Sequence, residues 1–464
     1  MCRRFFLHTF GCQMNVLDSE LLAEELELSG YERASSPRQA DIILLNTCSV
    51  RQHAEDKVYS LLGRMKHQDA RRPKKIIGVL GCMAQKDQML IFRRAPWVDL
   101  VVGPGRLALL PGLLERAAAG EGPILEVSLD RNAAPLAAVS ESFKCFLHRN
   151  TFAAFPRTQA MVRIMFGCDK CCSYCVVPQV RGPEQSRPAK EILEEVRRLA
   201  DAGCLEVTLL GQTVNSYKDR SGPRTVVLAD LLEMLHEIDG LRRIKFVTNH
   251  PRHMTKMLLE GVRDLPKVCP YLHVPAQSGS DAVLRRMKRG YTAGWYREML
   301  ARVREIIPQA VVTSDFIVGF CGESEEDFAQ TVDLVRFARF KNSFIFKYSP
   351  RPGTAAEKLA DDVPEAVKRR RNNQLLAVQN AISFEDNQAF VGRKVEILVE
   401  GSSKLGLKQA AAREKVQMVG RTTCDRIVVF DGEPQSAGRL LDVRILRADA
   451  LTLFGRLEQD SPAS

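Results

Sequence analysis

Three cysteines, Cys168, Cys172 and Cys175, stand close together in the segment FGCDKCCSYCVVP. Three thiolates at this spacing can ligate three irons of a [4Fe–4S] cluster and leave the fourth iron without a protein ligand. Ferredoxin-type electron carriers instead close every iron with cysteine. Because an open iron is a place where a small molecule can bind and react, the spacing predicts a catalytic cluster rather than a structural or electron-carrying one.

Cys171 leaves a second interpretation open, because the segment also reads Cys-x2-Cys-Cys-x2-Cys and four thiolates can hold zinc. Adjacent cysteines rarely both reach one small ion without backbone strain. Zinc knuckles usually separate their cysteine pairs by a longer loop, so the spacing favours a cluster over zinc. Cys171 is then expected to be a bystander thiol or a small packing residue.

A second set of three cysteines follows three apolar segments of the N-terminal region. Cys12 lies in TFGCQMN, Cys48 in LLNTCSVR and Cys82 in LGCMAQ. Ligands collect at the carboxyl ends of the strands in an open α/β sheet, so these thiols could converge and hold another cluster with one free iron. From the residues alone, three unrelated buried cysteines remain an alternative.

The elements that must position the N-terminal cysteines alternate between strands and helices over about the first 125 residues. This alternation predicts a parallel α/β domain over residues 3–120. Strands are expected at Arg4–Thr9, Asp41–Asn46, Ile76–Leu80 and Val98–Val102, and helices at Ser19–Leu28 and Ala54–His67. Residues 126–153 lack periodicity and are predicted to form a linker.

A second strand–helix series begins at Ala160 and predicts a partial, TIM-like (β/α)6 barrel over residues 154–385. Active residues of such barrels lie at the strand ends and in the loops that follow them. Strands are expected at Ala160–Met165, Glu206–Leu210, Arg243–Val247, Tyr271–Val274, Val311–Ile317 and Asn342–Tyr348. Helices are expected at Pro188–Ala202, Leu228–Ile238, Thr255–Leu265, Trp295–Ile307 and Glu325–Arg339.

The remainder of the chain predicts a charged helix and a small barrel. The helix covers Val363–Phe390, and its run Lys368-Arg369-Arg370-Arg371 is interpreted as a solvated face. From Val391 short strands alternate with glycines, which predicts a small all-β barrel over residues 388–457. Small barrels of this kind often bind nucleic acid through loops and a basic face.

Composition narrows the class of protein. The chain has 464 residues, and its 67 basic and 56 acidic residues give a net charge of +11, which favours an anionic partner such as nucleic acid. No apolar run is long enough for a membrane span. Thirteen cysteines in a large chain without an export signal indicate metal or redox chemistry in a reducing compartment, most simply the cytoplasm.

The motifs together resemble the radical S-adenosylmethionine (SAM) methylthiotransferases along nearly the whole chain. The resemblance rests on the six cysteines and on RGPEQSRP, LLGQTVNSY, VTNHPRH, PAQSGS, MKRGYT, DFIVGFCGESEEDF and YSPRPGT. It implies a methylthiotransferase domain, a radical SAM core and an RNA-binding TRAM barrel in the three predicted regions. NTCSVRQHAEDKV and YSPRPGTAA are most similar to the branch that makes 2-methylthio-N6-isopentenyladenosine at position 37 of tRNA.

The resemblance also implies roles for single residues. The cluster on Cys168, Cys172 and Cys175 would bind SAM and cleave it to a 5′-deoxyadenosyl radical, while a second SAM donates a methyl group. Cys12, Cys48 and Cys82 would hold an auxiliary cluster that carries the sulfur. The expected SAM contacts are Tyr174, Gly211, Gln212 and Asn215, and the expected RNA contacts are Arg421 and Arg426.

The expected partners are the anticodon stem-loop of tRNA and an electron donor of reductase or flavodoxin type, with the sulfur donor unidentified. A monomer that binds no membrane is expected. Related branches modify threonylcarbamoyl-adenosine in tRNA or an aspartate of a ribosomal protein, and both remain alternatives. So do an Fe–S RNA-binding regulator without turnover and, less favoured, a zinc-binding RNA module.

The chain departs from the family pattern at four positions near these sites. Phe166 stands where the tRNA enzymes usually carry Glu, Thr213 where Asn is usual, and Ala276 where Val is usual, while Cys171 is an additional cysteine. None of these changes removes a cluster ligand. They bear instead on the side chains around SAM and the substrate.

Overall fold

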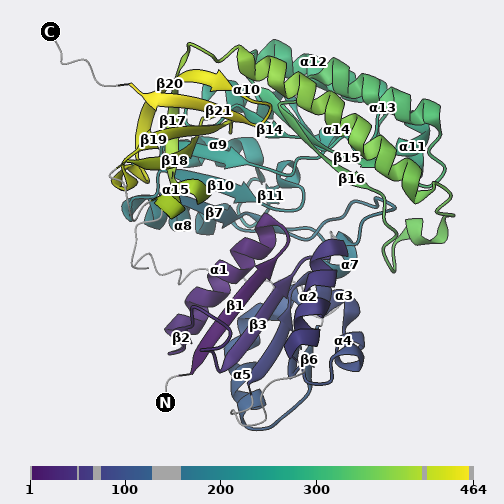
Figure 1. The fold of residues 1–464 in the computed structure, drawn as a ribbon, viewed down its shortest axis with the longest axis vertical. Coiled ribbons are helices and arrows are strands. Elements are labelled where there is room, and N and C mark those ends of the chain that lie inside the picture. Colours follow the sequence, from purple (N-terminus) through teal and green to yellow (C-terminus); the bar gives the residue numbers. More distant parts are fainter. Residues whose placement is uncertain (1–2, 50–51, 66–74, 128–157, 410–414, 459–464) are drawn as a thin grey trace.

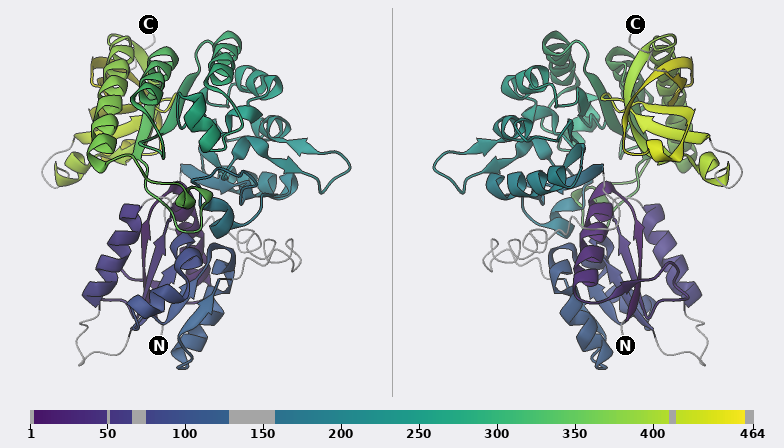
Figure 2. Two further views of the ribbon diagram at one scale, coloured as in Figure 1. Left: turned by 90° about the vertical axis from the view of Figure 1, so that its right-hand side faces the viewer. Right: turned by 90° about the vertical axis from the view of Figure 1, so that its left-hand side faces the viewer.

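The computed structural model describes residues 3–49, 52–65, 75–127, 158–409 and 415–458, which form three bodies along the chain (Figure 1). An N-terminal α/β domain lies on one side of a central α/β core, and a small β-barrel lies against another side of that core (Figure 2). The predicted fold class is confirmed. The predicted linker, residues 126–153, lies almost wholly outside the described residues.

The N-terminal domain is a parallel sheet with the strand order β2-β1-β3-β4-β5-β6. Strands β3 and β4 are continuous apolar runs because helices cover both faces of the sheet. The strands are β1 (Arg4–Phe10), β2 (Glu32–Arg33), β3 (Ile42–Thr47), β4 (Ile76–Leu80), β5 (Leu100–Val102) and β6 (Ile124–Glu126). This order resembles the flavodoxin-like arrangement, in which the order of strand addition reverses between β1 and β3.

Helices pack on each face of this sheet. One face carries α1 (Gln13–Leu28) and α5 (Leu110–Ala118), and the other carries α2 (Gln52–Met65), α3 (Cys82–Asp87) and α4 (Met89–Arg94). Helix α1 begins at Gln13, earlier than the predicted Ser19. Its first turns carry Met14 and Leu17, which pack on the central core rather than on the sheet. An amphipathic pattern directed at another domain was therefore missed in the sequence.

The core contains six parallel strands in sequence order, in the sheets β7-β10-β13 and β14-β15-β16, with β13 beside β14. They are β7 (Gln159–Arg163), β10 (Glu206–Leu210), β13 (Arg243–Phe246), β14 (Tyr271–His273), β15 (Val311–Val318) and β16 (Asn342–Lys347). In the part of the chain that the structure describes, β16 does not pair with β7. The predicted partial (β/α)6 barrel is confirmed.

The outer face of the core strands is covered by helices that share one apolar core with them. The helices are α8 (Ala189–Asp201), α9 (Leu228–His236), α10 (Lys256–Asp264), α12 (Ala293–Ile306), α13 (Glu325–Ala338) and α14 (Glu365–Gln388). On β10, Val207 and Leu209 point into that core, so the alternating Glu206, Thr208 and Leu210 face inward. We call this inner face of the partial barrel the lumen.

The C-terminal body is a closed barrel with the strand order β17-β18-β19-β21-β20, as predicted. Its strands are β17 (Lys394–Ser402), β18 (Val416–Arg421), β19 (Ile427–Gly432), β20 (Leu440–Ala448) and β21 (Thr452–Leu457), with α15 (Lys404–Gln409) after β17. Arg243, at the start of β13, donates to the Arg421 carbonyl, and Lys245 and Lys341 pair with Asp425. The barrel therefore closes the amino-terminal end of the lumen.

Helix α14 corrects one prediction. Its basic run was expected to face solvent, but Lys368 and Arg371 are buried. Lys368 pairs with Asp361 at 2.5 Å, and Arg371 pairs with Glu323 at 2.8 Å. Residues three apart in a helix share one face, and here that face packs on the core.

No helix among the described residues is long and apolar enough to cross a bilayer.

Candidate active site

The three N-terminal cysteines follow the carboxyl ends of neighbouring strands. Cys12 follows β1 and caps α1, Cys48 follows β3, and Cys82 begins α3 directly after β4. Cys12 and Cys48 therefore flank the point where the strand order reverses, which is where open α/β sheets bind ligands. Cys48 hydrogen-bonds to Cys12, and Cys82 lies close enough to Cys12 to feel its charge. The structure brings together the three thiols that the sequence placed far apart, and we call them the N-terminal triad.

Gly11 makes the approach of two of these cysteines possible. Its φ of +126° favours glycine, and a Cβ at this position would lie 2.2 Å from the Cβ of Cys48. No side chain fits between the two strand ends. The TFGC motif therefore needs its glycine for the close packing of Cys12 and Cys48.

A buried ion network joins the N-terminal triad to the core. Arg181 donates through Nε to Cys82 Sγ at 3.3 Å and through Nη2 to Asp18 Oδ2 at 2.7 Å. Asp18, on α1, also pairs with Arg163 at the end of β7. All three charged side chains are at most 3% exposed. The carboxylate of one domain thus pairs with two arginines of the other.

The same charges act on the thiols. The pKa of Cys12 is lowered to about 6, chiefly by the hydrogen bond with Cys48 and further by the charge of Arg181. Burial raises the pKa of Cys82, and the charge of Arg181 opposes this rise. Because the thiolate is the form that binds iron, Arg181 favours metal binding on this side of the site.

The core cysteines lie in one loop between β8 (Met165–Phe166) and α7 (Val177–Arg181). Cys172 and Cys168 each influence the pKa of Cys175, so Cys168, Cys172 and Cys175 lie together as a core triad. Arg289 donates to Cys172 Sγ at 3.2 Å, and Thr213 Oγ1 lies 3.5 Å from Cys168 Sγ. Burial raises the pKa of Cys175 to about 12 in the protein without metal.

Cys171 does not join the core triad, because its side chain is exposed and its thiol contacts the Asp169 carbonyl. Among the described residues, no group of three or more Cys, His, Asp and Glu is arranged to hold a single metal ion. In a [4Fe–4S] cluster each thiolate binds its own iron, so its ligands stand further apart than those of one zinc ion. Three soft thiolate donors at each site are compatible with an Fe–S cluster.

Helix α7 separates the two triads. It begins two residues after Cys175 and ends with Arg181, which contacts Cys82. Val176 and Val180 pack directly on Cys82. One short helix therefore connects a predicted ligand of the core triad with a predicted ligand of the N-terminal triad.

The predicted SAM contacts Gly211 and Gln212 follow β10 at the carboxyl end of the core strands. Gln212 Oε1 is buried and has no hydrogen-bond partner among the described residues, so it can accept a hydrogen bond from a bound amino group. A Cβ on Gly211 would lie 2.2 Å from Met165 Cγ. This glycine is therefore needed for packing against Met165, which by itself is no evidence of a contact with SAM. The unpartnered amide beside the core triad fits the amino-acid end of SAM.

The other two predicted SAM residues already have partners. Asn215 bonds the backbone of His250 in both directions, donating to its carbonyl at 2.9 Å and accepting from its N–H at 2.8 Å. The Tyr174 hydroxyl accepts from Arg289, and its ring meets Phe320 edge-on. These contacts indicate that Asn215 and Tyr174 position the loops around the site. Their roles as SAM contacts stay predictions.

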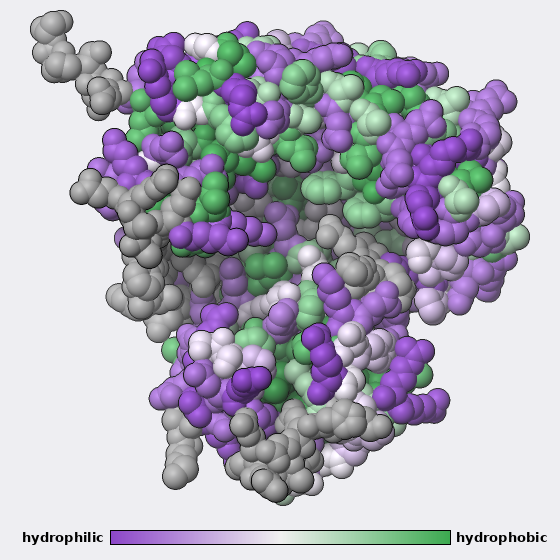
Figure 3. Space-filling model, in the orientation of Figure 1, coloured by the Kyte–Doolittle hydropathy of each residue, from purple (hydrophilic) through white to green (hydrophobic). Residues whose placement is uncertain are grey.

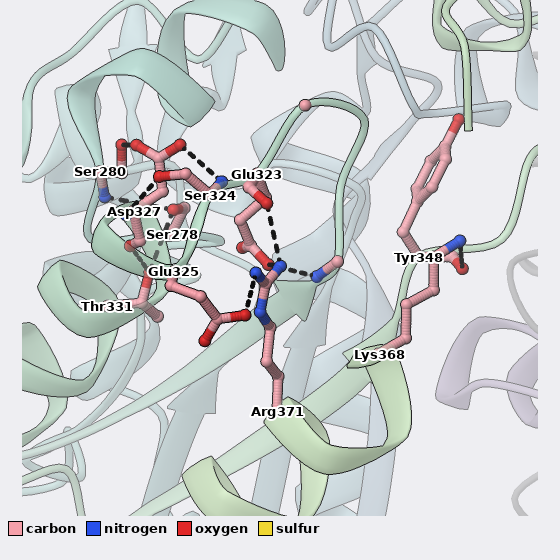
Figure 4. A network of polar contacts seen from close by, with 12 residues as sticks. Ser278, Ser280, Glu323, Ser324, Glu325, Asp327, Thr331, Tyr348, Lys368 and Arg371 are labelled. Atoms are coloured by element: carbon pink, nitrogen blue, oxygen red, sulfur yellow. Dashed lines mark hydrogen bonds and ion pairs between the residues drawn. The ribbon is translucent and has the colours of Figure 1, made fainter. Parts of the chain in front are cut away.

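A polar network holds the loop between β15 and α13 (Figure 4). Phe320 of this loop contacts Tyr174. Glu323 accepts from Gly319 N–H at 2.6 Å and from Arg371 of α14 at 2.8 Å. Burial raises the pKa of Glu323 to about 7 against these two contacts. Ser280 and Asp327 extend the network to the start of α11 (Asp281–Arg286). Helix α14 thus supports the core triad through this loop.

The two arginines predicted to contact RNA lie at the junction between the small barrel and the core. Arg421 pairs with Glu400 and Asp425, and its side chain is 30% exposed. Arg426 is buried, bonds Asn387 of α14 and lies over the ring of Phe390 at 4.5 Å. Both assignments stay predictions, and the burial of Arg426 weighs against a direct contact with phosphate.

Sequence reasoning missed the charged residues that surround the triads. Asp18, Arg163, Arg181 and Arg289 were not selected, although Arg181 and Arg289 stand in the quoted motifs RGPEQSRP and MKRGYT. Asn249 was also missed, and its buried Oδ1 has no partner among the described residues. The available signal was the presence of Arg181 and Arg289 inside two motifs that carry the family resemblance. Which cysteine each one meets was not visible in the sequence.

Family models match each of the three bodies. The uncharacterized protein family UPF0004 matches residues 4–103, the radical SAM superfamily matches residues 162–335, and the TRAM domain matches residues 388–457. The three matches follow the order of the three bodies in the structure. The predicted boundaries, 3–120, 154–385 and 388–457, stay predictions.

Full-length relatives carry one shared name. A protein of Rhodopirellula baltica is 56% identical over 461 residues, which cover 99% of this chain and 96% of that protein. A protein of Delftia acidovorans is 45% identical, with 98% and 99% covered. Each is named tRNA-2-methylthio-N(6)-dimethylallyladenosine synthase.

Among solved structures, the radical S-adenosylmethionine methyltransferase TsrM from Kitasatospora setae, with cobalamin and a [4Fe–4S] cluster bound, superposes with a TM-score of 0.53. The match covers 77% of this chain and 74% of that one at 14% identity. At this identity the similarity shows the fold alone.

Proposed function

Because the chain belongs to the family of the tRNA-2-methylthio-N6-dimethylallyladenosine synthases, which are radical SAM methylthiotransferases, we propose that it modifies N6-isopentenyladenosine at position 37 of tRNA. The reaction inserts a methylthio group at C2 of the adenine. The proposal names two [4Fe–4S] clusters and SAM as cofactors and the anticodon stem-loop as the substrate region. It also places the enzyme in the cytoplasm as a monomer.

One observation carries the proposal: two separate sets of three cysteines lie on either side of α7. An electron carrier or a sensor needs only one cluster, whereas sulfur insertion driven by a radical needs two. Cys168, Cys172 and Cys175 would hold the cluster that binds SAM, with Gln212 beside it. Cys12, Cys48 and Cys82 would hold the auxiliary cluster.

The chemistry of the substrate explains why such cofactors are needed. The C2–H bond of adenine is inert, and acid–base chemistry near neutral pH does not remove this hydrogen. Bound at the two triads, the clusters and SAM would supply the radical, the sulfur and the methyl group. The residues of this chain would supply the thiolates and orient the ligands.

The protein must also take the adenine out of the RNA stack. Sequence-specific RNA proteins mostly address single-stranded loops, and modifying enzymes bring the target base into a pocket. The TRAM barrel and the net charge of +11 support tRNA as the partner. Binding through phosphates is expected to weaken with rising salt.

The decisive experiment is reconstitution. Anaerobically loaded protein is incubated with SAM, a reductant and isopentenylated tRNA, and the nucleosides are analysed by mass spectrometry. We expect 2-methylthio-N6-isopentenyladenosine and about eight irons per chain, four for each cluster. SAM cleavage without a methylthiolated nucleoside would overturn the substrate assignment, and the absence of SAM cleavage would favour a regulator.

A deletion strain separates the remaining alternatives. If the chain acts on isopentenyladenosine, tRNA from the strain lacks the methylthio group and returns to normal with the intact gene. If threonylcarbamoyl-adenosine or a ribosomal aspartate is the target, the loss falls on that residue instead. The electron donor, of reductase or flavodoxin type, is identified by which one supports turnover in place of the chemical reductant.

A further inference from the structure

The lumen of the core is covered unevenly. On the side of β7, β10 and β13, helix α1 packs on Phe166, Leu210 and Val247 through an apolar group that also includes Met14 and Leu17. The small barrel closes the amino-terminal end. On the side of β16, Phe344 is 48% exposed and Phe346 is 37% exposed. Among the described residues, two large aromatic side chains therefore line this partly exposed side of the lumen.

The register of β15 and β16 places these rings inside the lumen. Phe344 pairs with Asp315 and Phe346 with Ile317, and residues paired across parallel strands point to the same face. The alternate residue Ser343 points to the other face, where it bonds Gln379 of α14. Phe344, Phe346 and Asp315 thus form one continuous surface, which we call the β16 wall.

Polar groups on this surface have the chemistry of base recognition. Asp315 Oδ1 lies 3.1 Å from His273 Nε2, and the Asp315 side chain remains 27% exposed. An N6-substituted adenine keeps one N6–H, which a carboxylate can accept as a hydrogen bond. An aromatic ring beside a carboxylate therefore offers a stacking face and an acceptor for the same base.

The β16 wall faces the same interior as the N-terminal triad. Cys12 and Tyr271 pack against one apolar group, and Tyr271 is the first residue of β14, beside β15. A base held on the wall would therefore lie between the open side and the sulfur-bearing residues. The space-filling view shows a hollow between the core and the N-terminal domain, with hydrophobic residues on its upper side (Figure 3).

We propose that the β16 wall binds the target adenine, with Phe344 stacking on the base and Asp315 accepting from its N6–H. This inference rests on the proposed function, because it names the residues that receive the base at that site. Stacking on an aromatic side chain is tolerant of base identity and adds measurably to affinity.

The test measures the affinity of the reconstituted full chain for an anticodon stem-loop RNA by fluorescence anisotropy. The RNA carries N6-isopentenyladenosine, or an abasic site, at the target position. We expect Phe344→Ala and Phe344→Leu to weaken binding about tenfold, because neither residue can stack, and Phe344→Trp to retain it. On the abasic RNA all variants should bind alike.

Phe384 provides a matched control. It is the same residue type, is 47% exposed and lies on α14, which packs on the other face of β16. Phe384→Ala should bind both RNAs like the wild type. Asp315→Asn should weaken binding of the modified RNA and leave binding of the abasic RNA unchanged.

Two results would overturn the inference. Either Phe344→Ala binds the modified RNA like the wild type, or it loses as much affinity for the abasic RNA as for the modified one. Product formation by the wild type is scored separately. If the wild type methylthiolates tRNA but substitution of Phe344 does not change RNA binding, the proposed function stands and the role of the β16 wall is refuted. If the wild type makes no product from any RNA, the proposed function is refuted. The comparison with abasic RNA then still shows whether the β16 wall binds the base.

Discussion

Cys168, Cys172 and Cys175 occupy a single loop of the core, whereas Cys12, Cys48 and Cys82 come from three strand ends that are far apart in the chain. Each triad has a buried arginine on one thiol, Arg289 on Cys172 and Arg181 on Cys82. Arg289 belongs to the same domain as its cysteine, but Arg181 reaches across the domain boundary. The core triad is thus defined by local spacing, and the N-terminal triad depends on a fold and on an interface.

The largest expected effect comes from removing ligands. Alanine at any of the six triad cysteines should reduce methylthiolated product below detection, because a cluster that loses a thiolate is lost or misplaced. Alanine at Cys48 should remove about four irons while the core triad still cleaves SAM; alanine at Cys172 should abolish SAM cleavage. Cys171→Ala is the control and should keep full iron and activity. Full activity after loss of Cys12, Cys48 or Cys82 would contradict the two-cluster proposal.

The interface is tested at Asp18. Asp18→Asn leaves Arg163 and Arg181 buried side by side without a carboxylate, which should cost about 3–5 kcal/mol of unfolding free energy. Chemical denaturation of the metal-free protein measures this cost. Arg116→Gln, which breaks the exposed pair with Glu121, is the control and should change little. Equal stability of Asp18→Asn and the wild type would show that the network does not hold the domains together.

Acid should lower the folding stability of the core, because His250 is buried there in its neutral form. Burial lowers the pKa of His250 to about 2, with the charge of Arg289 as the next cause, so the folded protein keeps this ring neutral. The unfolded chain takes up a proton below pH 6.5, and stability present above that pH is lost as the pH falls. Each pH unit below 6.5 should cost about 1.4 kcal/mol from this residue.

His250→Gln should remove that part of the acid sensitivity. Calorimetry of the metal-free variant and wild type at pH 7.5 and 5.5 measures the difference. His253, whose pKa is lowered to about 4, chiefly by burial, will leave some dependence in both proteins. Identical pH profiles of the variant and the wild type would show that His250 is not held neutral in the fold.

The smallest effect is expected at Thr213, whose hydroxyl lies near Cys168 Sγ. A hydrogen bond to a cluster sulfur stabilises the reduced state, so Thr213→Val should lower the reduction potential of the core cluster, and Thr213→Ser should restore it. A redox titration followed by electron paramagnetic resonance, in a Cys48→Ala background with only the core cluster, measures the shift. An unchanged potential would mean that the hydroxyl does not bond the sulfur.

The sequence by itself indicated the strands, most helices and the short segment that carries Cys168, Cys172 and Cys175, because apolar periodicity and residue spacing are local. β10 and β15 lie where the apolar periodicity predicted them, and the cysteines of the core triad stand within one short segment of the sequence. The charged run of α14 was misjudged for Lys368 and Arg371, since a local pattern does not show which face of a helix meets another element.

Only the tertiary structure decided which distant groups meet. The approach of Cys12 to Cys48, the contact of Arg181 with Cys82 and Asp18, and the inward register of Phe344 all join positions separated by tens to more than a hundred residues. Such contacts depend on strand order and domain packing, which no local pattern encodes. Arg426 of the small barrel shows the same limit, because its burial against α14 was set by the docking of the barrel on that helix.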